Sequence, residues 1–255
     1  MLVVQRIWGP QGGELVRRNY NAFQKSLGSL PFKVNYSVCT FPGDPAENMA
    51  LELEVGVIRA NLKSFSDSMN QILGATLQKR EFLLIYSGDV EIGQDLIMEA
   101  LASFQDNEET DSHAYTYSWQ VQGMGNDGSH LGLMGYNTAM MYNTRLLVLL
   151  KSQVWYPEYV DNGMLGEEEF EIEGQKEKVP LGGAEEPTFL LGVAKQDPYA
   201  YSIHNAGVIL PTTAQTGTDV KFSFKLARKK RMAEIYAAKF GLTVEDALRH
   251  YVVLR

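Results

Sequence analysis

Residues 81–104, EFLLIYSGDVEIGQDLIMEALASF, join a short apolar run to an amphipathic segment. The run 81–86 is apolar at every position except Glu81, and its length predicts a buried β-strand. In the segment 90–104, apolar side chains recur every three or four positions, which predicts a helix with one buried side. Those side chains are Ile92, Leu96, Ile97, Leu101 and Phe104. A strand that leads into a helix indicates a mixed body of strands and helices.

The sequence before this stretch also alternates between helical and extended patterns. Apolar residues at helical spacing predict a helix over 14–27, and strict alternation predicts a strand over 32–38. The segment 41–45 contains Pro, Gly and Asp and predicts a turn. A second alternating run predicts a strand over 51–57 that leads into a helix, and one long helix from Ala46 is the alternative.

The sequence after residue 105 is richer in predicted strands. Alternating and apolar runs predict strands at 115–121, 189–193 and 206–210. Residues 169–179 predict a projecting β-hairpin with Gly174 at the turn, in which glutamates share one face and lysines return on the second strand. The apolar block 146–150 predicts a buried strand or a short helix.

These elements predict an α+β fold, a strand-rich body with several helices and a C-terminal basic helical segment. The acidic connector 105–112 is the preferred subdomain boundary. We therefore expect three parts. Residues 1–108 form a mixed α/β subdomain, residues 109–220 form a β-rich subdomain with the projecting hairpin, and residues 221–255 form a basic helical tail.

Charge is strongly segregated along the chain. The 255 residues include 23 Lys and Arg against 31 Asp and Glu, and a net charge of -8 argues against a protein that coats nucleic acid with its whole surface. Residues 221–255 nevertheless carry a net charge of +6, and residues 1–220 carry -14. The densest group of cations supplies the candidate interaction residues, which are Lys221, Lys225, Arg228, Lys229, Lys230 and Arg231.

The basic end also predicts two helices separated by Gly241. Thr243 is the expected cap of the second helix, and Asp246 is its expected partner in a capping box. The spacing is that of a DNA-binding helix-turn-helix, but Glu245 and Asp246 would oppose the phosphate backbone at the start of the second helix.

Residues that signal catalysis or metal binding are sparse. The single cysteine, Cys39, excludes intramolecular disulfides and multi-cysteine zinc sites, and its apolar neighbours predict a small buried residue. The four histidines lack metal-binding spacing. Gly123 to Gly128 match G-x-G-x-x-G, yet the glycine-rich sequence up to Gly135 and the half-polar strand before it favour a surface or interface loop. We therefore predict no catalytic residue, no cofactor and no metal.

Charge segregation, aromatic strands and the hairpin favour a non-enzymatic structural protein that self-assembles into homo-oligomers. We expect the basic tail to dock on the acidic body of a neighbouring copy, in a soluble virus or phage particle component of the capsid or tail. The expected location is the virion or the cytoplasm, without a membrane segment. One alternative is a nucleic-acid-binding protein that uses the helix-turn-helix-like tail. The other is an α/β enzyme with its site at the Gly123–Gly135 loop.

Overall fold

The computed structural model describes residues 1–61, 65–77, 82–86, 92–105, 113–121, 139–144, 167–180, 192–193, 195–209, 220–249 and 251–254. Its helices are α1 (Gly12–Ser26), α2 (Pro45–Glu52), α3 (Phe65–Leu77), α4 (Gln94–Gln105), α8 (Val220–Phe240) and α9 (Val244–Leu248). Its strands are β1 (Leu2–Arg6), β2 (Asn35–Thr40), β3 (Gly56–Arg59), β4 (Phe82–Tyr86), β5 (His113–Val121), β6 (Ala139–Asn143), β7 (Glu167–Ile172), β8 (Gln175–Pro180), β9 (Ala200–Ile209) and β10 (Tyr251–Leu254).

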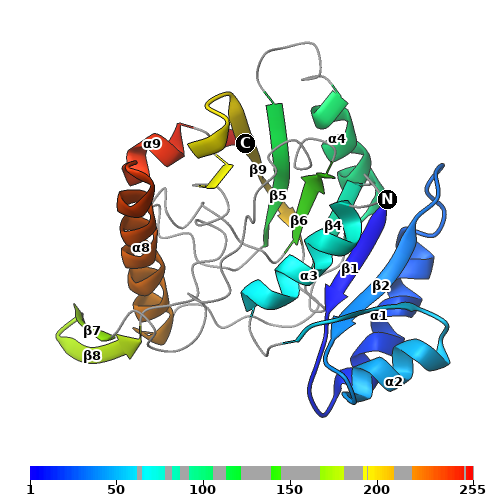
Figure 1. The fold of residues 1–255 in the computed structure, drawn as a ribbon. Coiled ribbons are helices and arrows are strands. Elements are labelled where there is room, and N and C mark those ends of the chain that lie inside the picture. Colours follow the sequence, from blue (N-terminus) through cyan, green and yellow to red (C-terminus); the bar gives the residue numbers. More distant parts are fainter. Residues whose placement is uncertain are drawn as a thin grey trace.

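Eight of the strands form one sheet in the order β10-β9-β5-β6-β4-β1-β2-β3 (Figure 1). Neighbouring strands are parallel except at β6, which runs antiparallel to both β4 and β5. The predicted combination of strands and helices is confirmed. The large sheet takes strands from each of the three predicted parts of the chain, whose boundaries stay a prediction.

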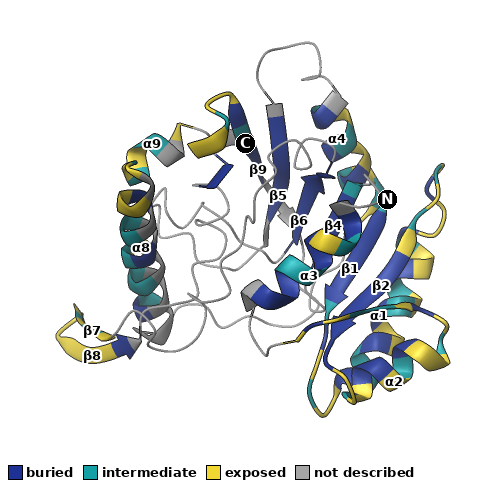
Figure 2. Ribbon diagram, viewed as in Figure 1, coloured by how far each residue is buried: buried dark blue, intermediate teal, exposed yellow. Residues whose placement is uncertain are grey.

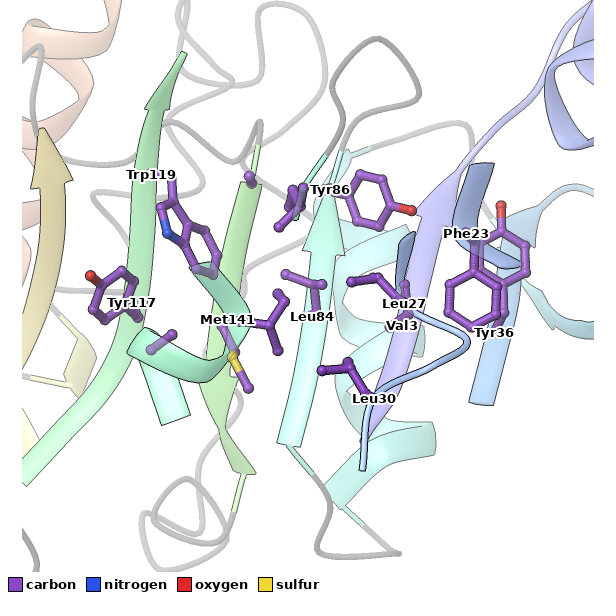
Figure 3. Packing of buried hydrophobic residues seen from close by; sticks show 14 of the residues in the cluster. Val3, Phe23, Leu27, Leu30, Tyr36, Leu84, Tyr86, Tyr117, Trp119 and Met141 are labelled. Atoms are coloured by element: carbon purple, nitrogen blue, oxygen red, sulfur yellow. The ribbon is translucent and has the colours of Figure 1, made fainter. Parts of the chain in front are cut away.

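Helices cover both faces of the large sheet, and each face has its own apolar core. On one face, α1, α2 and α4 contribute Val16, Ala50 and Ile97 to a cluster that Figure 3 shows from close by. On the other face, α3 and α8 contribute Ile72 and Met232. Alternate residues of β4 face the two cores, so this strand is buried on both sides. Burial on both sides explains the unbroken apolar run of its sequence.

The segment after β2 differs from the prediction. Neither a strand over 51–57 nor one long helix forms, because α2 ends at Glu52 and the edge strand β3 begins at Gly56. The start of α2 is fixed by Asp44, whose side chain caps the helix, and by Pro45, which suits the first helical position. The alternating run therefore spans a helix end, a turn and the start of a strand.

Most other predicted elements are confirmed with shifted ends, including helices α1 and α4 and strands β2, β4 and β5. The predicted strand 189–193 is wrong where the structure describes it, because Gly192 and Val193 are helical. The predicted strand 206–210 is part of the longer β9. Three predicted features lie outside the described residues, namely the connector 105–112 after Gln105, which ends α4, the Gly123–Gly135 loop and the block 146–150.

The predicted hairpin is confirmed as β7–β8, which turns at Glu173 and Gly174 with positive φ values of 52° and 76°. It lies beside the start of α8 at the lower left of Figure 1, and most of it is exposed (Figure 2). Lys176 Nζ lies 3.5 Å from carboxylate oxygens of Glu169 and Glu171. Opposite charges therefore meet on this hairpin, as its sequence predicts.

The basic end forms two helices, as predicted, and it then forms the strand β10, which was not predicted. Gly241 follows α8 with a φ of +70°, and α9 begins three residues later. The capping box is confirmed, because the Thr243 N–H donates to Asp246 Oδ2 at 2.8 Å and the Asp246 N–H donates to Thr243 Oγ1 at 3.0 Å. Within the described residues, no helix combines the length and the apolar character that crossing a membrane requires.

Candidate functional site at the carboxyl edge of the sheet

The strand order reverses at β1. From β1 the chain moves to β2 and β3 on one side, and it then returns to β4 on the other side of β1. In sheets of this kind, loops that leave the carboxyl ends of the strands diverge at such a point and form a crevice for ligands. We call the carboxyl ends of these parallel strands the carboxyl edge, and the candidate site is built there by the end of β3 and by described residues that follow β1 and β2.

Asp44 ties the loop after β1 to the loop after β2. Its Oδ2 accepts a hydrogen bond from the Gly9 N–H at 2.8 Å, and its Oδ1 accepts one from the Ala46 N–H at 2.9 Å. The two loops approach so closely that a Cβ atom on Gly12 would lie 2.9 Å from Asp44 Oδ1. A side chain at this position would force Asp44 or Ala46 to shift, so Gly12 allows the close approach that holds the two loops as one unit.

A second carboxylate joins the loop after β2 to the end of β3. Glu47 Oε2 accepts from the Gly43 N–H, and Glu47 Oε1 accepts from Arg59 Nε, each at 2.6 Å. The Glu47 side chain is 9% exposed, whereas the Arg59 side chain is 60% exposed. The Gly43 N–H and the Arg59 guanidinium lower the pKa of Glu47, so this carboxylate is charged at neutral pH.

An aromatic side chain is exposed at the same edge. Trp8 follows β1 with 44% of its surface exposed, and its ring packs on Phe41 with 5.4 Å between the ring centroids. Phe41 is buried, so its ring gives the indole a fixed packing surface. The loop that carries Trp8 is the one that Asp44 fixes through Gly9. The exposed part of the indole thus offers a supported surface for stacking with a flat ring.

Buried polar groups beneath this edge stabilise the fold. Asp67 in the first turn of α3 accepts a hydrogen bond from the Asn61 N–H at 2.8 Å. Cys39 is buried, as predicted, and its Sγ lies 3.9 Å from the carbonyl oxygen of Ser68. Burial raises the pKa of the Cys39 thiol to about 12, so the thiol stays protonated at neutral pH and is a poor nucleophile.

The carboxylates of this edge do not fit a metal ion. Across the described stretches of chain, no group of three or more His, Cys, Asp or Glu residues is placed to hold one. Both oxygens of Asp44 and both oxygens of Glu47 already accept hydrogen bonds from N–H groups. We derive no metal chemistry from these two residues. Asp89, which follows β4 in the sequence, lies outside the described residues.

The reversed strand β6 attaches one more segment to the carboxyl edge. Ala139, the first residue of β6, pairs with Tyr86, the last residue of β4. β5 is parallel to β4, so its last residue, Val121, also lies at the carboxyl edge. Both attachment points of the segment that contains the Gly123–Gly135 loop are therefore at this edge.

The six candidate interaction residues of the basic end all lie in α8 and not in the loops of the carboxyl edge. Arg231 Nε donates to both carboxylate oxygens of Glu168 in β7, at 2.9 and 2.8 Å, and Arg231 Nη1 lies 3.4 Å from Glu234 Oε2. Lys230 is exposed and Arg228 is half-buried. Basic α8 thus contacts the acidic hairpin of its own chain, and binding to other copies or to nucleic acid stays a prediction.

No sequence pattern predicted a functional role for Trp8, Asp44, Glu47 or Arg59. No strand was predicted at β1, so the loop that carries Trp8 was not recognised as a strand-to-helix connection. Two signals were present. An apolar run precedes Gly and Pro at the end of β1, and Asp44 is followed three residues later by Glu47, a spacing typical of helix starts.

No family model and no curated protein matches this sequence. Mannosyltransferase PcManGT from Pyrobaculum calidifontis matches in structure with a TM-score of 0.54 at 11% identity, over 93% of this chain and 63% of that one. Glucosyl-3-phosphoglycerate synthase from Mycobacterium tuberculosis matches with a TM-score of 0.53 at 10% identity, over 94% and 80%. A putative nucleotide-diphospho-sugar transferase from Desulfovibrio desulfuricans G20 matches with a TM-score of 0.38 at 13% identity, over 56% of this chain and 63% of that one. This chain thus spans less than two thirds of the length of two of these proteins.

These likenesses correct the functional prediction. A non-enzymatic structural protein of a virus or phage particle is contradicted, because the fold is one that two sugar-nucleotide enzymes share. The alternative of an α/β enzyme agrees better with the fold. The separation of acidic and basic residues was the main support for an assembly protein. Part of that opposite charge is now paired within one chain, by the contact between α8 and the hairpin. At 10% and 11% identity, the fold is what this chain has in common with the mannosyltransferase and the synthase.

Proposed function

We propose that this protein is an enzyme that binds a nucleoside-diphosphate sugar at the carboxyl edge and transfers the sugar to an acceptor. The observation that carries the proposal is the fold shared with two such enzymes over more than nine-tenths of this chain. The mannosyltransferase was solved in complex with GDP-Man and Mn²⁺, and the synthase in complex with Mg²⁺ and UDP.

The carboxyl edge offers two kinds of contact that a nucleoside diphosphate uses. The exposed indole of Trp8 suits stacking with a base, which requires only a flat ring. The exposed guanidinium of Arg59 suits phosphate oxygens, which it contacts with paired N–H groups. Asp44 and Glu47 hold the loops that carry or support these groups, so the site is organised before the ligand arrives.

The chemistry of sugar transfer needs positive charge beside the diphosphate. The bond between the anomeric carbon and the diphosphate oxygen breaks, the acceptor oxygen forms the new bond to that carbon, and the acceptor proton leaves. The departing diphosphate gains negative charge as the bond breaks, and a fixed cation stabilises it. Among the described residues of the carboxyl edge, Arg59 is the exposed cation in position to do so.

The test is titration of the purified protein with UDP and GDP by calorimetry, followed by assays for release of UDP or GDP from UDP-glucose and GDP-mannose. We expect binding of at least one diphosphate, and we expect Trp8→Ala to weaken it by about tenfold through loss of stacking. The matched control is Tyr199→Ala, which removes a side chain that is 61% exposed. Tyr199 lies just before β9, at the opposite edge of the sheet. Equal losses in the two variants, or no binding by the wild type, would contradict the proposal.

A further inference from the structure

Arg59 is an exposed cation whose position is set by one bond. Its Nε donates to Glu47 Oε1 at 2.6 Å, and 60% of its side chain remains exposed. Within the described part of the chain, the structure shows no other hydrogen bond or ion pair of this guanidinium. The N–H groups of both terminal nitrogens are consequently available to a ligand.

Glu47 is held in place by a second hydrogen bond, besides the one that it accepts from Arg59. Its second oxygen accepts from the N–H of Gly43, which has a φ of +78°, and the side chain is almost fully buried in the first turn of α2. An exposed ion pair spends much of its time open, because both long side chains lose freedom when it forms. Here only the arginine has that freedom, so the buried carboxylate restricts the direction in which the guanidinium points.

The same turn connects this pair to the aromatic residue of the site. Gly43 is followed by Asp44, which accepts a hydrogen bond from Gly9 in the loop that carries Trp8. β2 lies between β1 and β3. At ordinary strand spacing, the end of β1, which precedes Trp8, therefore lies about 10 Å from the end of β3, which contains Arg59. One rigid turn thus supports an aromatic surface on one side and a directed cation on the other.

We infer that Glu47 is a positioning residue that directs Arg59 toward the diphosphate of the nucleotide, with the terminal nitrogens of Arg59 donating to the phosphate oxygens. The inference rests on the proposed function, because it names how that site recognises the charged part of its ligand. Glu47 itself does not contact the ligand. Its effect on binding passes through Arg59 and requires phosphate groups on the ligand.

The experiment compares UDP with uridine, or GDP with guanosine, in calorimetric titrations of the full chain. We expect Glu47→Gln to weaken binding of the diphosphate by about tenfold while the affinity for the nucleoside stays within twofold of the wild type. In an Arg59→Met background, Glu47→Gln should have no further effect, because the residue through which it acts is gone. Glu47→Asp keeps the charge but shortens the side chain, so we expect the same selective loss if Glu47→Gln folds poorly.

The ion pair between Arg17 on α1 and Glu52 on α2 is a matched control, because its arginine is about as exposed as Arg59. Arg17 Nη2 lies 2.9 Å from Glu52 Oε1, and the Arg17 side chain is 53% exposed. Glu52→Gln should leave both affinities unchanged. The inference is overturned if Glu47→Gln weakens nucleoside and diphosphate equally, or if its effect persists without Arg59. Failure of the wild type to bind any diphosphate would instead overturn the proposed function, and the inference with it.

Discussion

His204 lies on the inner strand β9 with its imidazole fully buried. Its Nδ1 lies 3.0 Å from Ser118 Oγ on the neighbouring strand β5. Burial lowers the pKa of His204 to about 4, so the folded protein keeps this ring neutral under conditions in which an exposed histidine gains a proton. The side chains of the other histidines, His113, His130 and His250, lie outside the described residues.

The lowered pKa makes stability depend on pH. Between about pH 6.5 and pH 4, the unfolded chain binds a proton at His204 and the folded chain does not, so lowering the pH favours unfolding. We expect the contribution of His204 to the free energy of unfolding to fall by about 3 kcal/mol across this range. Denaturant unfolding at several pH values, compared between the wild type and His204→Gln, isolates the contribution. Identical pH profiles for the two proteins would contradict this prediction.

At the scale of elements, the hairpin β7–β8 depends on its contact with α8. An isolated two-stranded hairpin is marginally stable in water, and this one is largely exposed. Phe170 packs against the core, and Arg231 contributes paired hydrogen bonds to Glu168. Glu168 raises the pKa of the Arg231 guanidinium, which remains charged throughout the accessible pH range.

Removing the Arg231 contact should loosen the hairpin and leave the body intact. The side chains of Arg231 and Glu168 are 42% and 36% exposed, so water screens the pair and we expect Arg231→Met to cost at most about 1 kcal/mol. Hydrogen exchange should show lower protection across β7–β8, with protection of the large sheet unchanged. The matched control is Lys176→Met, which removes a cation that is 60% exposed from the hairpin itself. Equal losses of protection in the two variants would contradict a specific role for Arg231.

The elements that were predicted well are those whose own sequence pattern reflects which of their faces are buried. The hairpin alternates charged and apolar residues because one of its faces is in water, and β4 is wholly apolar because it has a core on each side. β1 is as long as β4, but its apolar run gives way to Gln5 and Arg6, and β3 has only four residues with exposed ends, so neither shows a clear local pattern. Trp8 follows β1, Glu47 lies in the first turn of α2 and Arg59 ends β3, and only the strand order β1-β2-β3 brings them to one edge. A linear motif search has no access to that order.

At the scale of the whole molecule, the basic end is part of the main body. β10 pairs with β9 and forms one edge of the large sheet. Phe224, Met232 and Ala237 of α8 are buried. The predicted basic helical tail therefore packs on the body of its own chain, and residues 251–254 form a strand and not a helix, although the charge of the tail is as the sequence indicates.

This arrangement predicts that a chain ending at residue 219 does not fold cooperatively. The truncation removes an edge strand and the buried side chains of α8, each of which contributes a few kcal/mol, against a typical domain stability of about 5–15 kcal/mol. Circular dichroism during heating should show a broad or absent transition. Lys230→Glu, which reverses the charge of an exposed residue of the same helix, should melt like the wild type. A sharp transition of the truncated chain at the wild-type temperature would contradict the prediction.

The reversed strand β6 has a consequence for how such a protein can diversify. Because β5 ends and β6 begins at the same edge, the segment that connects them has both of its ends at that edge. The length of such a segment can change while every strand keeps its neighbours and its register, since adding residues to a loop costs little closure entropy. Loops tolerate insertions and often carry binding residues, so binding can change between related proteins while the sheet is kept.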